Sequence, residues 1–483
     1  MRIFSRSFWK TLAWTYAAQV AASAGVFLAP AIVARLGNME DLGRYLLVQR
    51  LASSCVAPLT LGLAVALGRL LPLNKGKPGM EARWSLVSFA IVGLVATLFM
   101  VALWVQRTFY AGILFGTSAA STLVFPFALL ASANALQAVV YGYYRGCLRI
   151  GWANCLQAVT VGVVPVVAML QMKRIGLISA IMLMGYMTSA IVVLFASPAL
   201  RAIFRTTEDR GGPWLQDASK VLLSYGLGRV PGFIFVGLLL ATGPVWLAHY
   251  GSMTDVAMYA LGLSALRMGA AFFAPVGILT LPLLASAFGT GLSRGVRDDL
   301  SLLLRFSVIM TLLGSLQVAT LSRTLLQVWL GSTSVEGRGF FVLLVLAAPT
   351  YLTFEILRDP IDAASAFPYN TFILGLALCA FAVGAVTRTS AGLVIGQLAG
   401  FLLLGGASVA VARRLYQFTP GKLRSWLDGI LFCVLPVPFT WLMQRQFEGR
   451  LAILAVFELL LLAAFLMFIG RVWKRDSGSG VPP

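Results

Sequence analysis

Runs of about 20 apolar residues recur along this chain from Thr11 to Ala464, and no large water-soluble block separates them. A run of that length crosses the hydrocarbon core of a bilayer as an α-helix, which satisfies its own backbone hydrogen bonds. Apolar residues make up 59% of the sequence and charged residues only 11%. The pattern therefore predicts an all-α integral membrane protein.

The apolar runs predict about 14 transmembrane helices joined by short polar connections. We expect them at residues 11–33, 43–71, 84–106, 119–144, 151–171, 175–197, 218–246, 253–284, 302–326, 340–360, 370–387, 391–412, 426–444 and 450–471. If the N-terminus is cytoplasmic, most of the 37 lysine and arginine residues fall in cytoplasmic connections. Because cytoplasmic loops of membrane proteins are rich in basic residues, this asymmetry predicts that both termini are cytoplasmic.

A net charge of +20 raises the question of nucleic-acid binding. The basic residues lie in short loops and at span ends, without a basic helix or zinc-ligand spacing, so a nucleic-acid-binding protein is excluded.

The five cysteines fall in or beside apolar runs and form no CxxC pair, and His249 is the only histidine. The sequence therefore predicts no metal site, no histidine-based catalytic triad and no cofactor.

A short segment occurs twice in the chain: ARLGNMEDLGRY at 34–45 aligns with AHYGSMTDVAMY at 248–259, a shift of 214 positions. The match predicts that the first six spans repeat in spans seven to twelve. Because six is even, both copies insert in the same orientation. At each junction an aspartate, Asp41 or Asp255, is expected to cap the helix that follows.

The repeat predicts two pseudo-symmetric six-helix bundles around a central cavity, followed by two further helices. The longest polar connection follows the sixth span and marks the division. We expect an N-terminal bundle at 1–197, a cytoplasmic linker at 198–217, a C-terminal bundle at 218–412, two additional helices at 413–475 and a disordered tail at 476–483.

Three arginines lie deep inside predicted spans: Arg50 in the second, Arg229 in the seventh and Arg267 in the eighth. An arginine that faces acyl chains costs about 3–17 kcal/mol, so these side chains are expected to face water or a ligand. In the repeat Arg50 aligns with Ser264, one helical turn from Arg267. A guanidinium stays charged when buried and presents a planar pair of donors to phosphate oxygens. The sequence therefore predicts a cationic cavity that binds a phosphate-bearing headgroup.

Small polar residues follow one face of the helices in and around this predicted cavity. We expect the cavity to be lined by Thr15, Gln19, Ser23, Ser53, Ser54, Asn134, Gln137, Tyr141 and Ser264. The alternative is that such residues only join helices by hydrogen bonds. For the arginines, the alternative partners are backbone carbonyls or Glu355.

Several motifs resemble the Wzx-type polysaccharide flippases of the multidrug/oligosaccharidyl-lipid/polysaccharide exporter superfamily. The family pattern of a short turn before a second span is supplied by Arg35, Gly37, Gly43, Tyr45, Gly62 and Arg69. YGYYRGCLRIGWANCLQA at 141–158 is similar to the family's fourth-span exit, and YALGLSALRMGAAFFAPVGILTLPLLA at 259–285 to its eighth span. The likeness covers most of the first 285 residues.

The resemblance implies a two-lobed transporter in the bacterial cytoplasmic membrane. Such a protein moves an undecaprenyl-diphosphate-linked sugar unit to the outer leaflet by alternating access, alongside other polysaccharide assembly proteins. Related flippases have cavity arginines on spans two and eight, a role that Arg50 and Arg267 match by position. Many relatives couple to Na⁺ or H⁺ through buried carboxylates, whereas here only Glu355 and Glu458 are candidates. Glu355 lies three residues from Arg358, so an ion pair is expected, and coupling to an ion gradient or to the membrane potential stays open.

Three other functions remain open from the sequence. A membrane glycosyltransferase or polymerase would use acidic residues on the outer side, where Glu40 and Asp41 lie in the first, very short loop. A drug or cation exporter of the same superfamily would need acidic residues in its cavity, where this chain has arginines. A non-transporting scaffold is a further alternative. The sequence favours a flippase over these, and a transporter over an enzyme.

Overall fold

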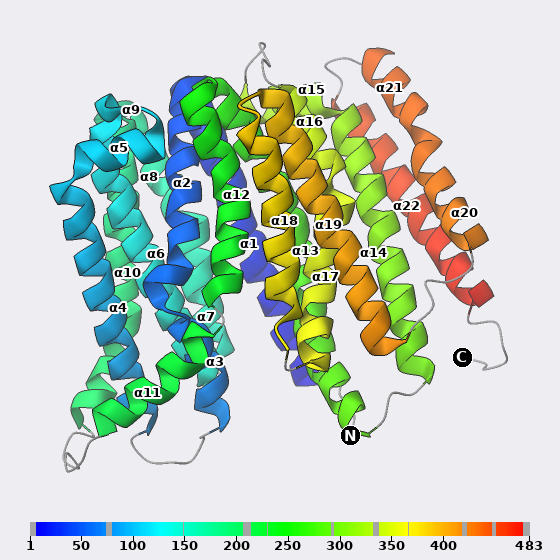
Figure 1. The fold of residues 1–483 in the computed structure, drawn as a ribbon. Coiled ribbons are helices and arrows are strands. Elements are labelled where there is room, and N and C mark those ends of the chain that lie inside the picture. Colours follow the sequence, from blue (N-terminus) through cyan, green and yellow to red (C-terminus); the bar gives the residue numbers. More distant parts are fainter. Residues whose placement is uncertain are drawn as a thin grey trace. The chain divides into compact units, whose positions relative to one another are not determined.

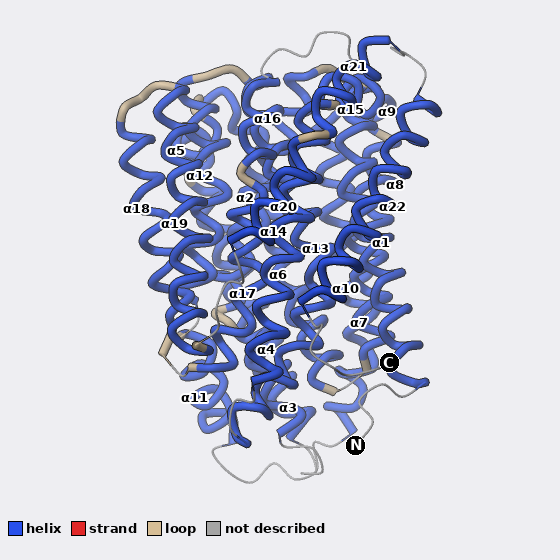
Figure 2. The backbone as a smooth tube through the Cα atoms, turned by 90° about the vertical axis from the view of Figure 1, so that its right-hand side faces the viewer, coloured by secondary structure: helices blue, strands red, loops and turns tan. Residues whose placement is uncertain are grey.

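The computed structural model describes residues 6–73, 80–147, 149–205, 214–228, 230–290, 294–331, 338–365, 367–417, 423–446 and 451–476. Within these ranges all regular structure is helical, as predicted (Figures 1 and 2). The first part of the chain forms α1 (Arg6–Leu36), α2 (Met39–Thr60), α3 (Leu63–Leu73), α4 (Met80–Val105), α5 (Arg107–Phe115), η1 (Ser118–Leu123), α6 (Val124–Gly146), α7 (Ile150–Gln157), η2 (Ala158–Val163), α8 (Val164–Leu170), α9 (Met172–Ile175), α10 (Leu177–Arg205), α11 (Trp214–Leu227) and α12 (Val230–Tyr250). The remainder forms α13 (Met253–Thr290), α14 (Arg294–Thr320), α15 (Ser322–Leu330), α16 (Arg338–Leu346), α17 (Ala348–Ala364), α18 (Tyr369–Val386), α19 (Ser390–Tyr416), α20 (Leu423–Val434), α21 (Pro436–Gln446) and α22 (Leu451–Asp476).

The described part of the chain contains 11 segments long and apolar enough to cross a membrane, or 12 if α16 and α17, bent by 46°, form one span. The chain is a multi-pass membrane protein, and the prediction of about 14 spans is compatible with this number. Several predicted spans are divided rather than single helices, among them 151–171, 302–326, 340–360 and 426–444. Span 43–71 is divided into α2 and α3, and span 218–246 into α11 and α12.

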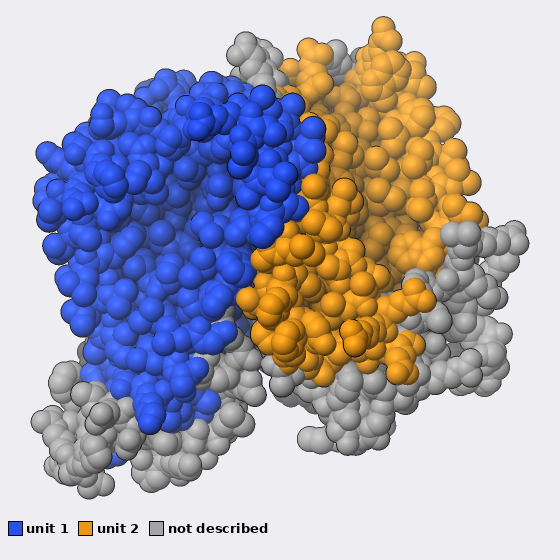
Figure 3. Space-filling view, in the orientation of Figure 1, with its two compact units in different colours: residues 1–264, 378–397 blue, residues 265–377, 398–483 orange. Residues whose placement is uncertain are grey.

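The described helices form two compact units (Figure 3). Unit 1 comprises residues 1–264 and 378–397, and unit 2 comprises residues 265–377 and 398–483. These boundaries differ from those that the repeat predicts, so the division into two six-helix bundles around a central cavity stays a prediction. The predicted linker begins and ends in helices, because Pro198–Arg205 belongs to α10 and Trp214–Asp217 to α11. Residues 206–213 and 477–483 lie outside the described residues.

Unit 1 is built around α6, which packs against α2, α3, α4 and α10. Helices in a membrane approach most closely where their side chains are small. Gly142 of α6 shows this directly, because a Cβ added there would lie 2.3 Å from the Ala64 carbonyl oxygen of α3. The backbones of α6 and α3 are therefore in close contact on the helix that carries Asn134, Gln137 and Tyr141.

The junction between α1 and α2 has the same structure as the junction between α12 and α13. The first pair of helices ends at Leu36 and resumes at Met39, and the second ends at Tyr250 and resumes at Met253, which is the same spacing shifted by 214 residues. The agreement of both boundaries supports the internal repeat.

Capping at these two junctions differs from the prediction. The N-cap residues are Asn38 and Ser252, and Asp41 and Asp255 follow them within the first turn. The Asn38 side chain accepts a hydrogen bond from the Asp41 backbone N–H at 2.8 Å. Ser252 Oγ accepts from the Asp255 N–H at 3.1 Å, and Asp255 Oδ2 accepts from the Ser252 N–H at 3.1 Å, which completes a capping box. The prediction that the aspartates are the caps was wrong by three residues, because Asn and Ser cap equally well.

In unit 2, α14 packs against α16, α17, α20 and α21. Its apolar contact with the C-terminal helices centres on Ile309, Leu313, Cys433 and Phe465. Polar contacts extend the same interface, because Thr440 Oγ1 donates to Gln317 Oε1 at 2.7 Å. The C-terminal helices therefore pack against α14 through both apolar contacts and a hydrogen bond.

Replacing Thr440 by valine should lower the free energy of unfolding by about 1 kcal/mol, because the buried Gln317 carbonyl oxygen loses its donor. Thermal unfolding of the purified protein in detergent measures the change. Thr97→Val is the matched control, since the exposed Thr97 hydroxyl bonds only to Gly93 of its own helix. Equal melting temperatures for both variants would show that the Thr440 contact adds no stability.

Candidate functional site

Arg50 lies near the middle of α2 and is buried, with 5% of its surface exposed. Its guanidinium donates from Nη2 to the Ala260 carbonyl oxygen of α13 at 3.1 Å and to Ser264 Oγ. Ser264 Oγ in turn donates to the Ala260 carbonyl at 2.9 Å. All of these residues belong to unit 1. Arg50 therefore joins α2 to α13 through uncharged groups.

This environment differs from the open aqueous cavity that the sequence predicts around Arg50. The guanidinium is buried, and a backbone carbonyl is one of its partners, as in the alternative considered from the sequence. Ser264, which the repeat aligns with Arg50, is its other partner. The cost of burial is offset here because the side chain donates to a carbonyl and a hydroxyl inside the protein.

Arg267 follows Ser264 by three residues on α13 and belongs to unit 2, where its side chain is exposed. It lies within electrostatic reach of the hydroxyl of Tyr351, a buried residue of α17. Glu355 also lies within electrostatic reach of this hydroxyl, and Glu355 pairs with Arg358 at 3.7 Å. The predicted ion pair of Glu355 is therefore confirmed, and the four side chains form a cluster with a net charge of +1.

The third predicted arginine, Arg229, lies outside the described residues, between α11 and α12. One helix ends at Leu227 and the next begins at Val230, in a stretch that contains Gly228 and Pro231. The side chain of Thr15 on α1 is likewise not described.

The other residues predicted to line a cavity all belong to unit 1. Seven of them are half-buried and Ser264 is buried; the seven are Gln19, Ser23, Ser53, Ser54, Asn134, Gln137 and Tyr141. Besides Ser264, three have identified partners: Ser53, Ser54 and Tyr141, whose ring centroid lies 5.7 Å from the Arg145 guanidinium carbon. Ser53 Oγ donates to the Gln49 carbonyl at 2.8 Å, and Ser54 Oγ donates to the carbonyls of Arg50 at 2.9 Å and Gly237 at 3.1 Å. Ser54 therefore joins α2 to α12, and a role in lining a cavity stays a prediction for the whole set.

The sequence did not predict the close contact between two helix breaks in unit 1. The break between α2 and α3 has Leu61 at φ 49° and Gly62 at φ 72°. A Cβ added to Gly62 would lie 2.4 Å from the carbonyl oxygen of Gly226, near the end of α11. The backbone at the helix break in the second predicted span therefore contacts the backbone near the helix break in the seventh.

A polar cluster joins α4 to the end of α6. The Glu81 carboxylate accepts hydrogen bonds from the Tyr143 hydroxyl and the Cys147 thiol, each at 3.0 Å. Burial, together with the Glu81 carboxylate, raises the pKa of the Cys147 thiol to about 12. Cys147 therefore stays a neutral thiol at physiological pH, which does not suit a nucleophile.

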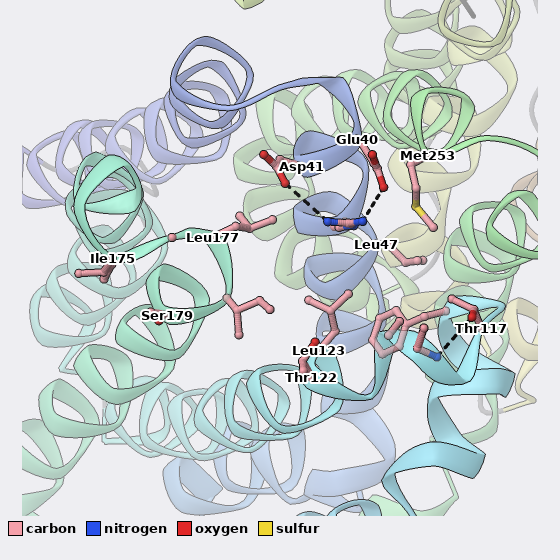
Figure 4. Close-up of a pocket in the computed structure, with 16 residues that line it drawn as sticks. Glu40, Asp41, Leu47, Thr117, Thr122, Leu123, Ile175, Leu177, Ser179 and Met253 are labelled. Carbon is pink, nitrogen blue, oxygen red and sulfur yellow. Dashed lines mark hydrogen bonds and ion pairs between the residues drawn. The ribbon is translucent and has the colours of Figure 1, made fainter.

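Unit 1 also contains a cavity of about 630 Å³ that the sequence did not predict (Figure 4). It is lined by the start of α2, the α5–η1 connection, the α9–α10 connection and Met253 at the start of α13. Arg44 pairs there with Glu40 and, at 3.9 Å, with Asp41. The sequence singled out the two acidic residues, but the other walls come from segments at least 70 residues away along the chain.

No model of a known protein family matches the sequence, and no curated protein matches it. Solved structures do match its fold. The lipid II flippase MurJ, in an inward closed conformation, superposes with a TM-score of 0.70 at 10% identity, over 97% of this chain and 100% of that one. An inward-facing multidrug-resistance transporter of the MATE family of the MOP superfamily gives 0.65 at 13% identity, over 84% and 98%. A mutant of the Vibrio cholerae MATE transporter VcmN gives 0.58 at 15%, over 86% and 98%. The chain therefore has the fold of these membrane transporters.

Proposed function

We propose that this chain is a flippase of the Wzx type, within the multidrug/oligosaccharidyl-lipid/polysaccharide exporter superfamily. It moves a polyprenyl-diphosphate-linked oligosaccharide from the cytoplasmic to the outer leaflet of the bacterial cytoplasmic membrane, with both termini in the cytoplasm. The observation that carries the proposal is Arg50, a buried arginine near the middle of a helix, in a fold shared with a lipid II flippase.

The choice of arginine supports a phosphate-bearing cargo. Arg50 makes two hydrogen bonds to uncharged groups on α13, and these can be exchanged for bonds to phosphate oxygens, in which the acceptor is charged as well as the donor. A guanidinium does not lose its proton inside a protein, so it suits a permanent anion better than a proton relay. We assign diphosphate binding to Arg50, Arg267 and Arg229.

In the proposed cycle, α2 moves relative to α13 and frees the Arg50 guanidinium from Ala260 and Ser264. The diphosphate then takes their place, and the half-buried polar residues of α1, α2 and α6 contact the sugar. Ser264 regains its contact with Arg50 when the headgroup leaves. Binding energy for the headgroup thus offsets the loss of the α2–α13 contact, which couples cargo binding to the movement.

Native mass spectrometry of the purified protein tests this cargo assignment. We expect polyprenyl diphosphate to remain bound under conditions where polyprenyl monophosphate dissociates, because two phosphates engage more guanidinium donors. Ethidium, an organic cation, should not bind. Retention of ethidium together with loss of the diphosphate lipid would replace the flippase proposal by a drug exporter.

The drug or cation exporter is the second candidate, since the fold is also that of MATE transporters. Its cavity would need acidic residues, whereas the buried charge near the middle of α2 is an arginine, Arg50. A glycosyltransferase or polymerase is disfavoured because its candidate acids, Glu40 and Asp41, are paired with Arg44. We therefore propose no chemical step for this protein.

Glu355 is the candidate for coupling to Na⁺ or H⁺, and its pairing with Arg358 favours a structural role. We expect Glu355→Gln to keep at least half of the wild-type transport rate and to respond to sodium as the wild type does. Transport into liposomes, compared in sodium-containing and sodium-free buffers, measures both quantities. A sodium response that disappears in Glu355→Gln alone would identify Glu355 as the coupling residue.

A further inference from the structure

The cavity of about 630 Å³ in unit 1 has the size of a site for a small organic ligand, for which volumes of about 300–1,000 Å³ are usual. It lies where α2 and α10 both begin, and Met253 at the start of α13 completes the wall. Figure 4 shows Glu40, Asp41 and Ser179 around the cavity, with Leu47, Leu123 and Leu177 between them. The lining is therefore mixed, with polar groups set among apolar side chains.

Hydrogen-bond donors reach the cavity from the first turn of α10. The first backbone N–H groups of a helix have no partner within the helix. Here the residue before the helix is Gly176, at φ 80°, which has no side chain to cap them. A Cβ added to Gly176 would meet no atom within 4 Å. Leu177, Ile178 and Ser179 line the cavity, and their N–H groups have no acceptor within α10.

Acceptors and a further donor come from α2. The carboxylates of Glu40 and Asp41 accept hydrogen bonds, and the Arg44 guanidinium, held between them, donates. Two carboxylates repel a phosphate, and the arginine beside them repels a metal cation, so neither ion suits the site. The charges of these three side chains sum to −1 and are already paired with one another. The site is therefore suited to an uncharged ligand that both donates and accepts hydrogen bonds.

We propose that this cavity binds uncharged sugar residues through their hydroxyl groups. Each hydroxyl is both a donor and an acceptor, so carboxylates, guanidinium and backbone N–H groups can all be satisfied at once. The apolar side chains cover the carbon faces of the rings. The inference rests on the proposed function, under which this end of the protein faces the outer side, where the oligosaccharide emerges. The sugar comes either from the transported lipid or from free glycan outside the membrane.

Saturation-transfer NMR on the purified full-length protein in nanodiscs tests the proposal, with maltotriose, cellotriose and triacetylchitotriose as probes. We expect transfer to at least one trisaccharide. The double variant Glu40→Gln/Arg44→Ala should weaken its affinity about tenfold or more, since two hydrogen bonds to charged groups are lost. Both side chains are substantially exposed, so this variant should fold. The matched control is Arg174→Ala, which removes an exposed charge next to the α9–α10 wall but outside the lining.

Failure to detect transfer to any of the three sugars would overturn the proposal, as would equal affinity of the double variant and the wild type. Repeating the measurement with polyprenyl-diphosphate-linked trisaccharide separates the two sources, because tighter binding than that of the free sugar points to the transported lipid. The proposed function fails separately if the wild type does not translocate that lipid. Sugar binding that persists in that case leaves the cavity as a glycan site on a different transporter.

Discussion

Arg50→Ala should abolish translocation of the lipid-linked oligosaccharide while the protein still inserts and folds. Two charge-assisted hydrogen bonds to phosphate contribute about 3–6 kcal/mol, so we expect a loss of about 100-fold or more. Arg50→Lys should restore only a small part of the rate, because an ammonium group keeps the charge but lacks the planar pair of donors. Initial rates in proteoliposomes, normalised to the amount of folded protein, give both values.

Arg50 also joins α2 to α13, so its variants need a comparison that removes this contact alone. Ser264→Ala deletes the hydroxyl partner and keeps the cation. We expect a loss of no more than about tenfold, the size of one ordinary hydrogen bond. Arg107→Ala, an exposed arginine at the start of α5, serves as the control for general effects of charge removal. If Ser264→Ala is as inactive as Arg50→Ala, or if Arg50→Lys is fully active, Arg50 does not act by binding phosphate.

Alanine at Gly62 should prevent stable folding or lower the free energy of unfolding by about 3 kcal/mol or more. The residue has φ 72°, which costs a non-glycine residue about 1–2 kcal/mol, and the new Cβ would overlap the Gly226 carbonyl at 2.4 Å. Gly226→Ala tests the close contact alone, since its Cβ would lie 2.5 Å from the Leu61 carbonyl oxygen. Thermal unfolding and gel filtration in detergent provide the readouts.

Gly93→Ala on α4 is the matched control for these two changes, because a Cβ there would meet no atom within 4 Å. It should be neutral or stabilising, since alanine has the higher helix propensity. Normal stability of both Gly62→Ala and Gly226→Ala would mean that the two helix breaks do not pack against each other in the membrane.

The helical class and the span pattern were predictable because a bilayer imposes a simple rule on length and polarity. The two helix breaks, between α2 and α3 and between α11 and α12, were only partly predictable. Gly228 and Pro231 indicate the one between α11 and α12, but Leu61–Gly62 lies in an apolar run without proline at the break itself. Its conformation is fixed by contact with Gly226, more than 160 residues away. Tertiary packing of this kind leaves no local pattern in the sequence.

The sequence identifies individual charged residues, whose role in a site stays a prediction, but not the contacts that they make. A charged residue in an apolar run identifies Arg50, and the spacing of three identifies the Glu355–Arg358 pair. Local spacing could not give the partners of Arg50, because Ala260 and Ser264 belong to a distant helix. The cavity at Arg44 could not be predicted for the same reason, since its walls converge only in the folded chain.

Translocation by the wild-type protein in liposomes tests the central claim most directly. The substrate is a fluorescent oligosaccharide on polyprenyl diphosphate, and a membrane-impermeant reductant bleaches the fraction that has reached the outer leaflet. We predict that the protein moves this lipid across the bilayer and does not move the same oligosaccharide on uncharged polyprenol. Equal movement of both lipids, or movement of ethidium without the diphosphate lipid, would contradict the account.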